Sequence, residues 1–135
     1  MDETLGGVRV GTDLVSVGQV AESVARFGDR YVDRIYTAHE ISCCRGTPAV
    51  VAAGLAARFA AKEATVKVLR SVGHQPDWRS IEVRREPAGW CRLSLSGEAA
   101  RMAEEQGISE LAVSLTHEGP MAAAVVVAVC AGDEE

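Results

Sequence analysis

The feature that most constrains this chain lies at its centre, where residues 58–67 read RFAAKEATVK. The segment places four charged side chains among alanine and apolar residues, and a charge in such surroundings is costly unless it is paired, bound to a ligand or at the edge of the core. In a helix, Arg58 lies one turn before Lys62, and Glu63 one turn before Lys67. A carboxylate beside cations is what a phosphate–metal site needs, because the carboxylate binds a hard cation and the cations bind phosphate oxygens.

A simpler interpretation of this segment is also open. Glu63 and Lys67 have the spacing of an ordinary helical ion pair on a solvated face, which is worth about 0.2–0.5 kcal/mol. Taken alone, Asp13 is equally an ordinary turn or capping residue and His117 an edge histidine. The choice between the two interpretations depends on the rest of the chain.

Two further segments favour the functional interpretation. Residues 8–15 read as a short apolar strand with an acid, Asp13, soon after a glycine. Residues 111–117 and 121–129 read as two strands joined by a tight turn at residues 118–120, with Thr116 and His117 at the end of the first strand.

These segments, in this order, resemble the holo-acyl-carrier-protein synthase family, the short, trimeric 4′-phosphopantetheinyl transferases. The resemblance rests on Gly11-Thr12-Asp13, on residues 58–64 with Lys67, and on residues 113–117. Residues 34–37 followed by Glu40, and residues 81–83 followed by Gly89, are weaker matches. The similarity covers roughly residues 8–129, nearly the whole chain.

The resemblance implies an α+β fold, in which a small, mostly antiparallel sheet packs against a long central helix. A single domain is expected over residues 1–135, with its core at about 8–129. The implied reaction transfers the 4′-phosphopantetheine moiety of coenzyme A to a serine of an apo acyl carrier protein, depends on Mg²⁺ and releases 3′,5′-ADP. The implied assembly is a homotrimer with active sites between subunits.

The resemblance also implies a role for each matched residue. Asp13 and Glu63 would hold Mg²⁺, and Lys67 would contact the phosphates and assist the leaving group. Lys62 would reach the phosphate region. Arg58 and His117, with Thr116 beside them, would contact the nucleotide end of coenzyme A. Glu63 or a metal-bound water would take the serine proton.

Local signals predict the order of helices and strands. Helix starts are indicated by Ser16, by Thr37 with Glu40 in a capping box, and by Thr47 followed by Pro48. The central helix is expected to end near residue 69 or 70. Helices are predicted at 17–27, 29–36, after 37, from 48 and at 97–106, and strands at 8–15, 80–85, 90–96, 108–116 and 121–129.

Composition and charge limit the possible functions and cellular locations of the chain. A net charge of −5 without a basic tract argues against a general nucleic-acid binder. Residues 1–5 lack the basic and apolar regions of a signal peptide, and residues 121–131 are too few to span a bilayer. We therefore expect a cytoplasmic protein with its four cysteines reduced. With only 4% aromatic residues, the chain would gain stability by sharing apolar surface between subunits.

Two departures from the family pattern concern the carrier protein. Family members commonly have arginine at the position of Gln19 and an aromatic residue at that of Thr65, so weaker or different carrier selection is expected, including a specialised, polyketide-type carrier. Arg26 lies two turns beyond Gln19 and is a substitute cation. A non-catalytic homologue that binds coenzyme A or a carrier is the alternative. His39 and His74 match no functional position and are expected at the surface.

Overall fold

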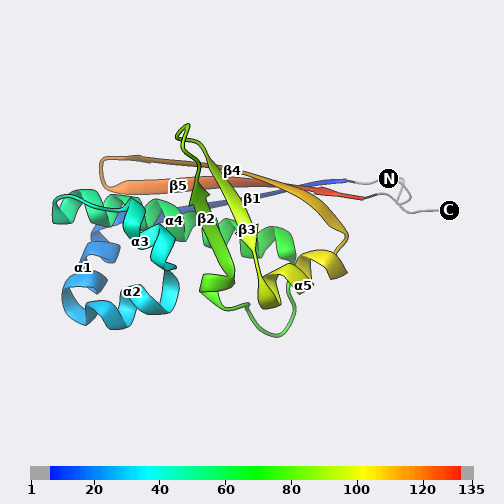
Figure 1. Cartoon of the computed structure of the whole chain (residues 1–135), viewed down its shortest axis with the longest axis horizontal. Coiled ribbons are helices and arrows are strands. Elements are labelled where there is room, and N and C mark those ends of the chain that lie inside the picture. The colour runs from blue at the N-terminus through cyan, green and yellow to red at the C-terminus, as the bar shows by residue number, and fades with distance from the viewer. Residues whose placement is uncertain (1–6, 132–135) are drawn as a thin grey trace.

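The computed structural model describes residues 7–131. It is an α+β structure, as expected, with a long central helix against a small antiparallel sheet (Figure 1). Its strands are β1 (Val8–Ser16), β2 (Ile81–Arg85), β3 (Cys91–Leu95), β4 (Ile108–Glu118) and β5 (Met121–Cys130). Its helices are α1 (Val17–Phe27), α2 (Asp29–Ile35), α3 (Ala38–Cys43), α4 (Pro48–Leu69), the short 3₁₀ helix η1 (Trp78–Ser80) and α5 (Gly97–Glu105).

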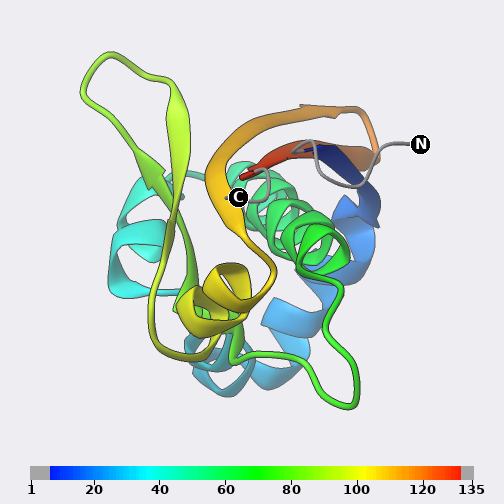
Figure 2. The same cartoon turned by 90° about the vertical axis from the view of Figure 1, so that its right-hand side faces the viewer.

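The main sheet has three antiparallel strands in the order β1-β5-β4, so β1 and β4 form its two edges. Figure 2 shows this sheet curving over one side of α4. The register aligns Asp13 with Ala124, and Ala124 with Leu115, in one row across the sheet. A separate hairpin of β2 and β3 projects beyond the body of the molecule (Figure 2).

Small residues let α4 lie very close to the sheet. Ala60, Ala61 and Ala64 are fully buried, and they pack with Ala124, Val126 and Ala128 of β5. On β1, a Cβ atom at Gly11 would lie only 2.3 Å from the Ala64 carbonyl oxygen. No side chain fits at that distance, so glycine is needed there to bring β1 against the helix.

The predicted helix starts are confirmed. The side chain of Ser16 accepts a hydrogen bond from the Gln19 N–H, Thr37 and Glu40 form a capping box, and Thr47 caps α4 with Pro48 in its first turn. The boundaries differ by a residue or two from those expected: α2 ends at Ile35, and β4 continues to Glu118. None of the helices within residues 7–131 is long and apolar enough to cross a membrane.

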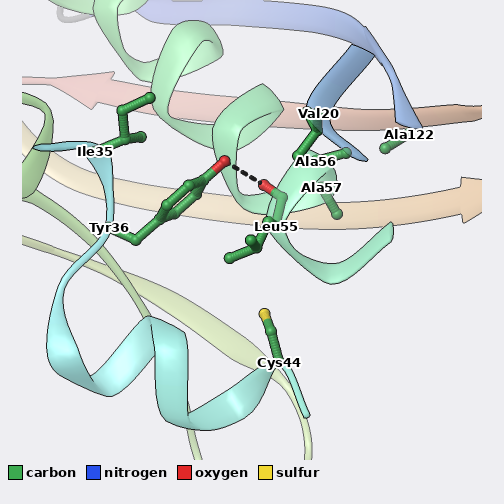
Figure 3. Packing of buried hydrophobic residues seen from close by; sticks show 8 residues of the cluster. All are labelled: Val20, Ile35, Tyr36, Cys44, Leu55, Ala56, Ala57 and Ala122. Carbon is green, nitrogen blue, oxygen red and sulfur yellow. Dashed lines mark hydrogen bonds between the residues drawn. The ribbon is translucent and has the colours of Figure 1, made fainter. Parts of the chain in front are cut away.

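The first part of α4 packs on the α1–α3 region. Figure 3 shows the Tyr36 ring directed at α4, where its hydroxyl donates a hydrogen bond of 3.0 Å to the Leu55 carbonyl. Burial raises the pKa of Tyr36, which keeps the hydroxyl protonated as a donor. The rest of this buried cluster consists of Val20, Ile35, Cys44, Ala56, Ala57 and Ala122.

A glycine-to-alanine pair tests the close contact between β1 and α4. Gly11→Ala should lower the free energy of unfolding by about 1–3 kcal/mol, because the new methyl group overlaps the backbone of Ala64. Gly18→Ala is the matched control: its nearest neighbour is Ser16 Oγ at 3.7 Å, so the change should stabilise α1 by up to about 1 kcal/mol. Denaturant unfolding of both variants measures the difference, and equal stabilities would contradict the proposed contact.

Candidate active site

One group of expected site residues gathers at the β1 edge of the sheet. Lys67 Nζ lies 3.2 Å from Asp13 Oδ1 and donates a 2.7 Å hydrogen bond to the Thr12 carbonyl. The ion partner of Lys67 is therefore Asp13, on another element, and the simple Glu63–Lys67 helical pair is not what forms. Lys67 and Asp13 are partly exposed, at 55% and 21% of their side chains, so the group faces solvent.

Glu63 shares this edge with Asp13. Burial raises the pKa of the Glu63 carboxyl, the charge of Asp13 raises it further, and Lys67 lowers it only in part. Two acids thus repel each other beside one lysine. Asp13 pairs across the sheet with Ala124, whose side chain is buried against α4, so Asp13 also faces the helix. Because β1 approaches α4 so closely at Gly11, the Asp13 carboxylate lies near Glu63.

These two carboxylates suit a hard divalent cation. Within residues 7–131, no group of three or more His, Cys, Asp and Glu residues is placed to hold a metal by itself. Mg²⁺ does not need one, because it commonly binds one or two carboxylates and takes its other ligands from water and substrate phosphates. Burial contributes most to the raised pKa of Glu63, and a bound cation would relieve the added repulsion from Asp13. Asp13 and Glu63 therefore fit such an ion.

Three other expected residues line a cleft at the β4 edge. Arg58, Thr116 and His117 lie on the wall of a cavity of about 460 Å³. Arg58 is only 7% exposed, and its Nη1 donates to the Gly54 carbonyl at 3.2 Å. Its Nε has no hydrogen-bond partner among the described residues. A buried guanidinium N–H without a partner is costly, and an anionic guest in the cleft would supply one.

The two groups do not meet within one chain. β1 and β4 are on opposite edges of the sheet, separated by β5. Along α4, Arg58 and Lys67 are nine residues apart, which is about 13 Å of helix. The chain therefore presents an acidic half-site on one edge and a cationic half-site on the other.

Lys62 is placed differently from expectation. Its side chain is completely buried and its Nζ lies 2.9 Å from Glu40 Oε1, which is also fully buried. The ammonium further donates to the carbonyls of Trp78 and Ile81. Burial lowers the pKa of Lys62, and Glu40 opposes that shift. The expected contact of Lys62 with substrate phosphates does not agree with this position, because its donors are already used inside the protein.

Glu40 completes this internal network. Its two carboxylate oxygens accept hydrogen bonds from the backbone N–H groups of Thr37 (2.8 Å) and Val83 (2.6 Å). The ion pair thus ties α3, α4 and β2 together. The sequence showed Glu40 as a capping residue and a weak motif match, but not as the partner of Lys62, because the two are 22 residues apart.

Several residues of the cleft were not found from the sequence. They come from α3, α4, β2 and β3 and include Cys43, Cys44, Val50, Arg85 and Cys91. No local pattern marks them, since tertiary folding alone brings them together. His39, expected at the surface, is half-buried, and its Nε2 accepts a hydrogen bond from the Arg85 N–H at 3.1 Å. His74 is exposed as expected and lies 2.6 Å from Glu98.

Comparison with known proteins decides the family. The model of the 4′-phosphopantetheinyl transferase superfamily matches residues 9–130. The chain belongs to this superfamily. The holo-[acyl-carrier-protein] synthase of Desulforudis audaxviator (strain MP104C) is 40% identical over 120 residues, covering 89% of this chain and 91% of that protein. That of Chloroflexus aurantiacus (strain ATCC 29366 / DSM 635 / J-10-fl) is 43% identical over 130 residues, covering 87% and 95%.

Solved structures of this superfamily share the fold. The Chronobacterium ammoniagenes complex with coenzyme A is 30% identical, with a TM-score of 0.77 over 90% of this chain and 96% of that one. The Mycobacterium tuberculosis acyl carrier protein synthase is 35% identical, with a TM-score of 0.70 over 92% and 99%. The expected family, fold and enzyme class, a phosphopantetheinyl transferase, are confirmed.

The buried ion pair of Lys62 with Glu40 should contribute much more to the free energy of unfolding than the exposed pair of Lys67 with Asp13. Lys62→Ala leaves Glu40 as an uncompensated charge in the core and should lower the free energy of unfolding by about 3–5 kcal/mol. Lys67→Ala, on the same helix, breaks the exposed pair with Asp13 and should cost less than about 1 kcal/mol. Chemical denaturation compares them, and similar losses would contradict the assigned positions.

The raised pKa of Glu63 predicts a pH-dependent effect on stability. An acid with a raised pKa in the folded state binds its proton more tightly there, so it destabilises the fold as pH rises from the unfolded value, about 4.3, through the folded value. Glu63→Gln should remove this loss, so without divalent metal the variant should gain stability relative to the parent between pH 4 and pH 7. Denaturation at both pH values measures it, and a constant difference would contradict repulsion at this edge.

Proposed function

We propose that this protein transfers the 4′-phosphopantetheine moiety of coenzyme A to a serine of an apo acyl carrier protein, with Mg²⁺, and releases 3′,5′-ADP. The observation that carries the proposal is the gathering of Asp13, Glu63 and Lys67 at the β1 edge of the sheet. The opposite, β4 edge holds a cleft lined by cations. Relatives at 36–43% identity are holo-[acyl-carrier-protein] synthases. A cytoplasmic location and a single domain over the whole chain are part of the same proposal.

The cleft at the β4 edge suits the nucleotide end of coenzyme A. Its 3′-phosphate needs cations or N–H donors, and the unpartnered Nε of Arg58 with the exposed side chains of Thr116 and His117 provide them. Support comes from the Helicobacter pylori and Chronobacterium ammoniagenes relatives, whose structures are complexes with coenzyme A.

The acidic half-site suits the pyrophosphate. Mg²⁺ held by Asp13 and Glu63 would neutralise phosphate charge, as such ions do in phosphoryl transfer. Lys67 is exposed enough to turn from Asp13 to a phosphate oxygen, where its charge would stabilise the leaving 3′,5′-ADP. Positioning and charge neutralisation then account for the catalysis, because the serine attacks a pyrophosphate and requires no covalent intermediate on this chain.

The outer face of the sheet suits an assembly of identical chains. Its side chains alternate with those facing α4, and they include exposed apolar residues. These are Val8, Val10, Leu14, Met121, Val125 and Val129, each 37–67% exposed. An apolar face of this kind marks an interaction site. A closed trimer would cover it and would set the β1 edge of one copy beside the β4 edge of the next.

The α1–α2 surface suits the carrier protein. Phe27, Tyr31 and Trp78 line a hollow that is bordered by Arg30 and Arg34. Apolar residues between cations fit an acidic amphipathic helix. Gln19, early in α1, is exposed and neutral. The cations of this surface lie instead at the end of α1, where Arg26 is 5.5 Å from the centre of the Phe27 ring, and on α2. This shift supports a carrier preference different from that of relatives with arginine at position 19.

Transfer itself is tested by intact-mass spectrometry of a panel of apo carriers with this protein, coenzyme A and Mg²⁺. We expect a gain of one phosphopantetheine on at least one carrier, abolished by EDTA. Asp13→Asn should lower the rate by at least about 100-fold, the order expected when one electrostatic partner of a transition state is lost, while its unfolding curve stays close to that of the parent. Full Mg²⁺-dependent activity in this variant would remove Asp13 from the mechanism.

A charge on the outer sheet face tests the assembly. Val10→Glu should turn a trimer into monomers in light scattering and abolish transfer at the same time, because a buried, unpaired carboxylate is costly at an apolar interface. Val72→Glu is the matched control, since Val72 is 92% exposed on a loop away from that face, and it should leave mass and activity unchanged. Active monomers of the Val10 variant would refute shared sites.

A further inference from the structure

Three of the four cysteines line the cleft at the β4 edge. They are Cys43, Cys44 and Cys91, and they share the cavity with Arg58, Arg85 and His117. Neither the superfamily motifs nor the transfer reaction uses a thiol of the protein. Thiols react most readily where they are partly exposed and surrounded by cations, because cations favour the thiolate.

One of these thiols is buried, and a second is half-buried against the core. Cys44 is 7% exposed and belongs to the cluster around Tyr36 and Leu55 (Figure 3). Its side chain also packs on Gly54. Burial raises the pKa of Cys44, and Arg58 offsets that rise only in part. Cys91 packs against the buried cluster of Ala60, Ala61 and Val83. Cys44 is therefore poorly placed to attack a reagent, and Cys91 has one side covered by the core.

Cys43 is the thiol that remains. It is partly exposed at the end of α3 and is absent from the buried clusters. Its Sγ lies 3.6 Å from His39 Nε2. That nitrogen accepts the backbone N–H of Arg85, and because a backbone N–H only donates, Nε2 carries no proton and cannot donate to the sulfur. The Cys43 sulfur is thus in contact with His39, and it lines the same cavity as Arg85.

A second observation points to an anion as the ligand of this cleft. Arg58 is more than nine-tenths buried, lines the same cavity, and its Nε lacks a hydrogen-bond partner among residues 7–131. A small molecule that carries carboxylates would find a partner in Arg58 or Arg85 as it reached Cys43.

We propose that Cys43 is a site of S-thiolation by small, carboxylate-bearing disulfides, and that the adduct excludes the nucleotide end of coenzyme A from the cleft. The Cys43 thiolate attacks one sulfur of the disulfide, and the disulfide bond breaks as the new one forms. The other half leaves as a thiolate and takes up the proton that Cys43 released to solvent. Cys43 is oxidised, the departing half is reduced, and a free thiol reverses the reaction. The exclusion of coenzyme A rests on the proposed function, whereas the reaction at Cys43 does not.

The experiment uses the full-length protein with glutathione disulfide as the anionic probe and hydroxyethyl disulfide as the uncharged one. We expect peptide mass mapping to place the first adduct on Cys43. For each probe, the rate with the folded protein is divided by the rate of the same probe with the unfolded chain. This ratio should be several-fold higher for glutathione disulfide than for hydroxyethyl disulfide, and added salt should remove the difference. First modification of Cys44, Cys91 or Cys130, or no charge preference at low salt, would overturn the proposal.

Competition and activity complete the test. Coenzyme A should slow modification of Cys43 several-fold, and the modified protein should lose most of its transfer activity and regain it with dithiothreitol. Cys43→Ser should keep its own starting rate through the same treatment. An adduct on Cys43 that neither competes with coenzyme A nor lowers transfer would overturn the exclusion. A protein that forms the Cys43 adduct but modifies no carrier refutes the proposed function alone, and an active protein thiolated elsewhere refutes this inference alone.

Discussion

The close contact between α4 and the sheet determines where every candidate site residue lies. Alanines on the helix and glycine on β1 bring the two backbones so near that a Cβ at position 11 would overlap the Ala64 carbonyl. A larger side chain in this layer would move β1 away from the helix and Asp13 away from Glu63 and Lys67. Since the aromatic content is low, the energy of this packing comes from many small contacts rather than from a few large side chains. The fold therefore depends on an interface that tolerates little change in volume.

The same helix serves both edges of the sheet. Its middle and end carry Glu63 and Lys67 to β1, and an earlier turn carries Arg58 to the cleft beside β4. Between them the buried pair of Lys62 and Glu40 fixes α4 to α3 and β2, and so holds the cleft wall in place. Neither edge alone has both the acids Asp13 and Glu63 and the cations that line the cleft. The exposed apolar face of the sheet supports an assembly in which neighbouring copies supply the missing edge.

Local features could be predicted from the sequence, and tertiary ones only in part. The caps at Ser16, Thr37 and Thr47 depend on neighbouring residues, so their patterns were sufficient. Helical spacing grouped Arg58 with Lys62, but the structure separates their roles. Because apolar residues occur on every side of α4, its pattern does not show which face meets which neighbour. The partner of Lys62 and the three thiols of the cleft depend on chain segments far apart in sequence, and no local signal marks them.

Subunit complementation tests the central claim, that the active site is shared between copies, most directly. One variant, Asp13→Asn, would disable the acidic edge, and a second, Arg58→Gln, the cationic edge. Each alone should be nearly inactive. When the two are unfolded and refolded together, random mixing should restore about a quarter of the sites, because an intact edge of one variant then meets an intact edge of the other. Recovery of transfer in the mixture is the predicted result. A mixture no more active than the sum of its parts, although mixed assemblies are present, would contradict the account.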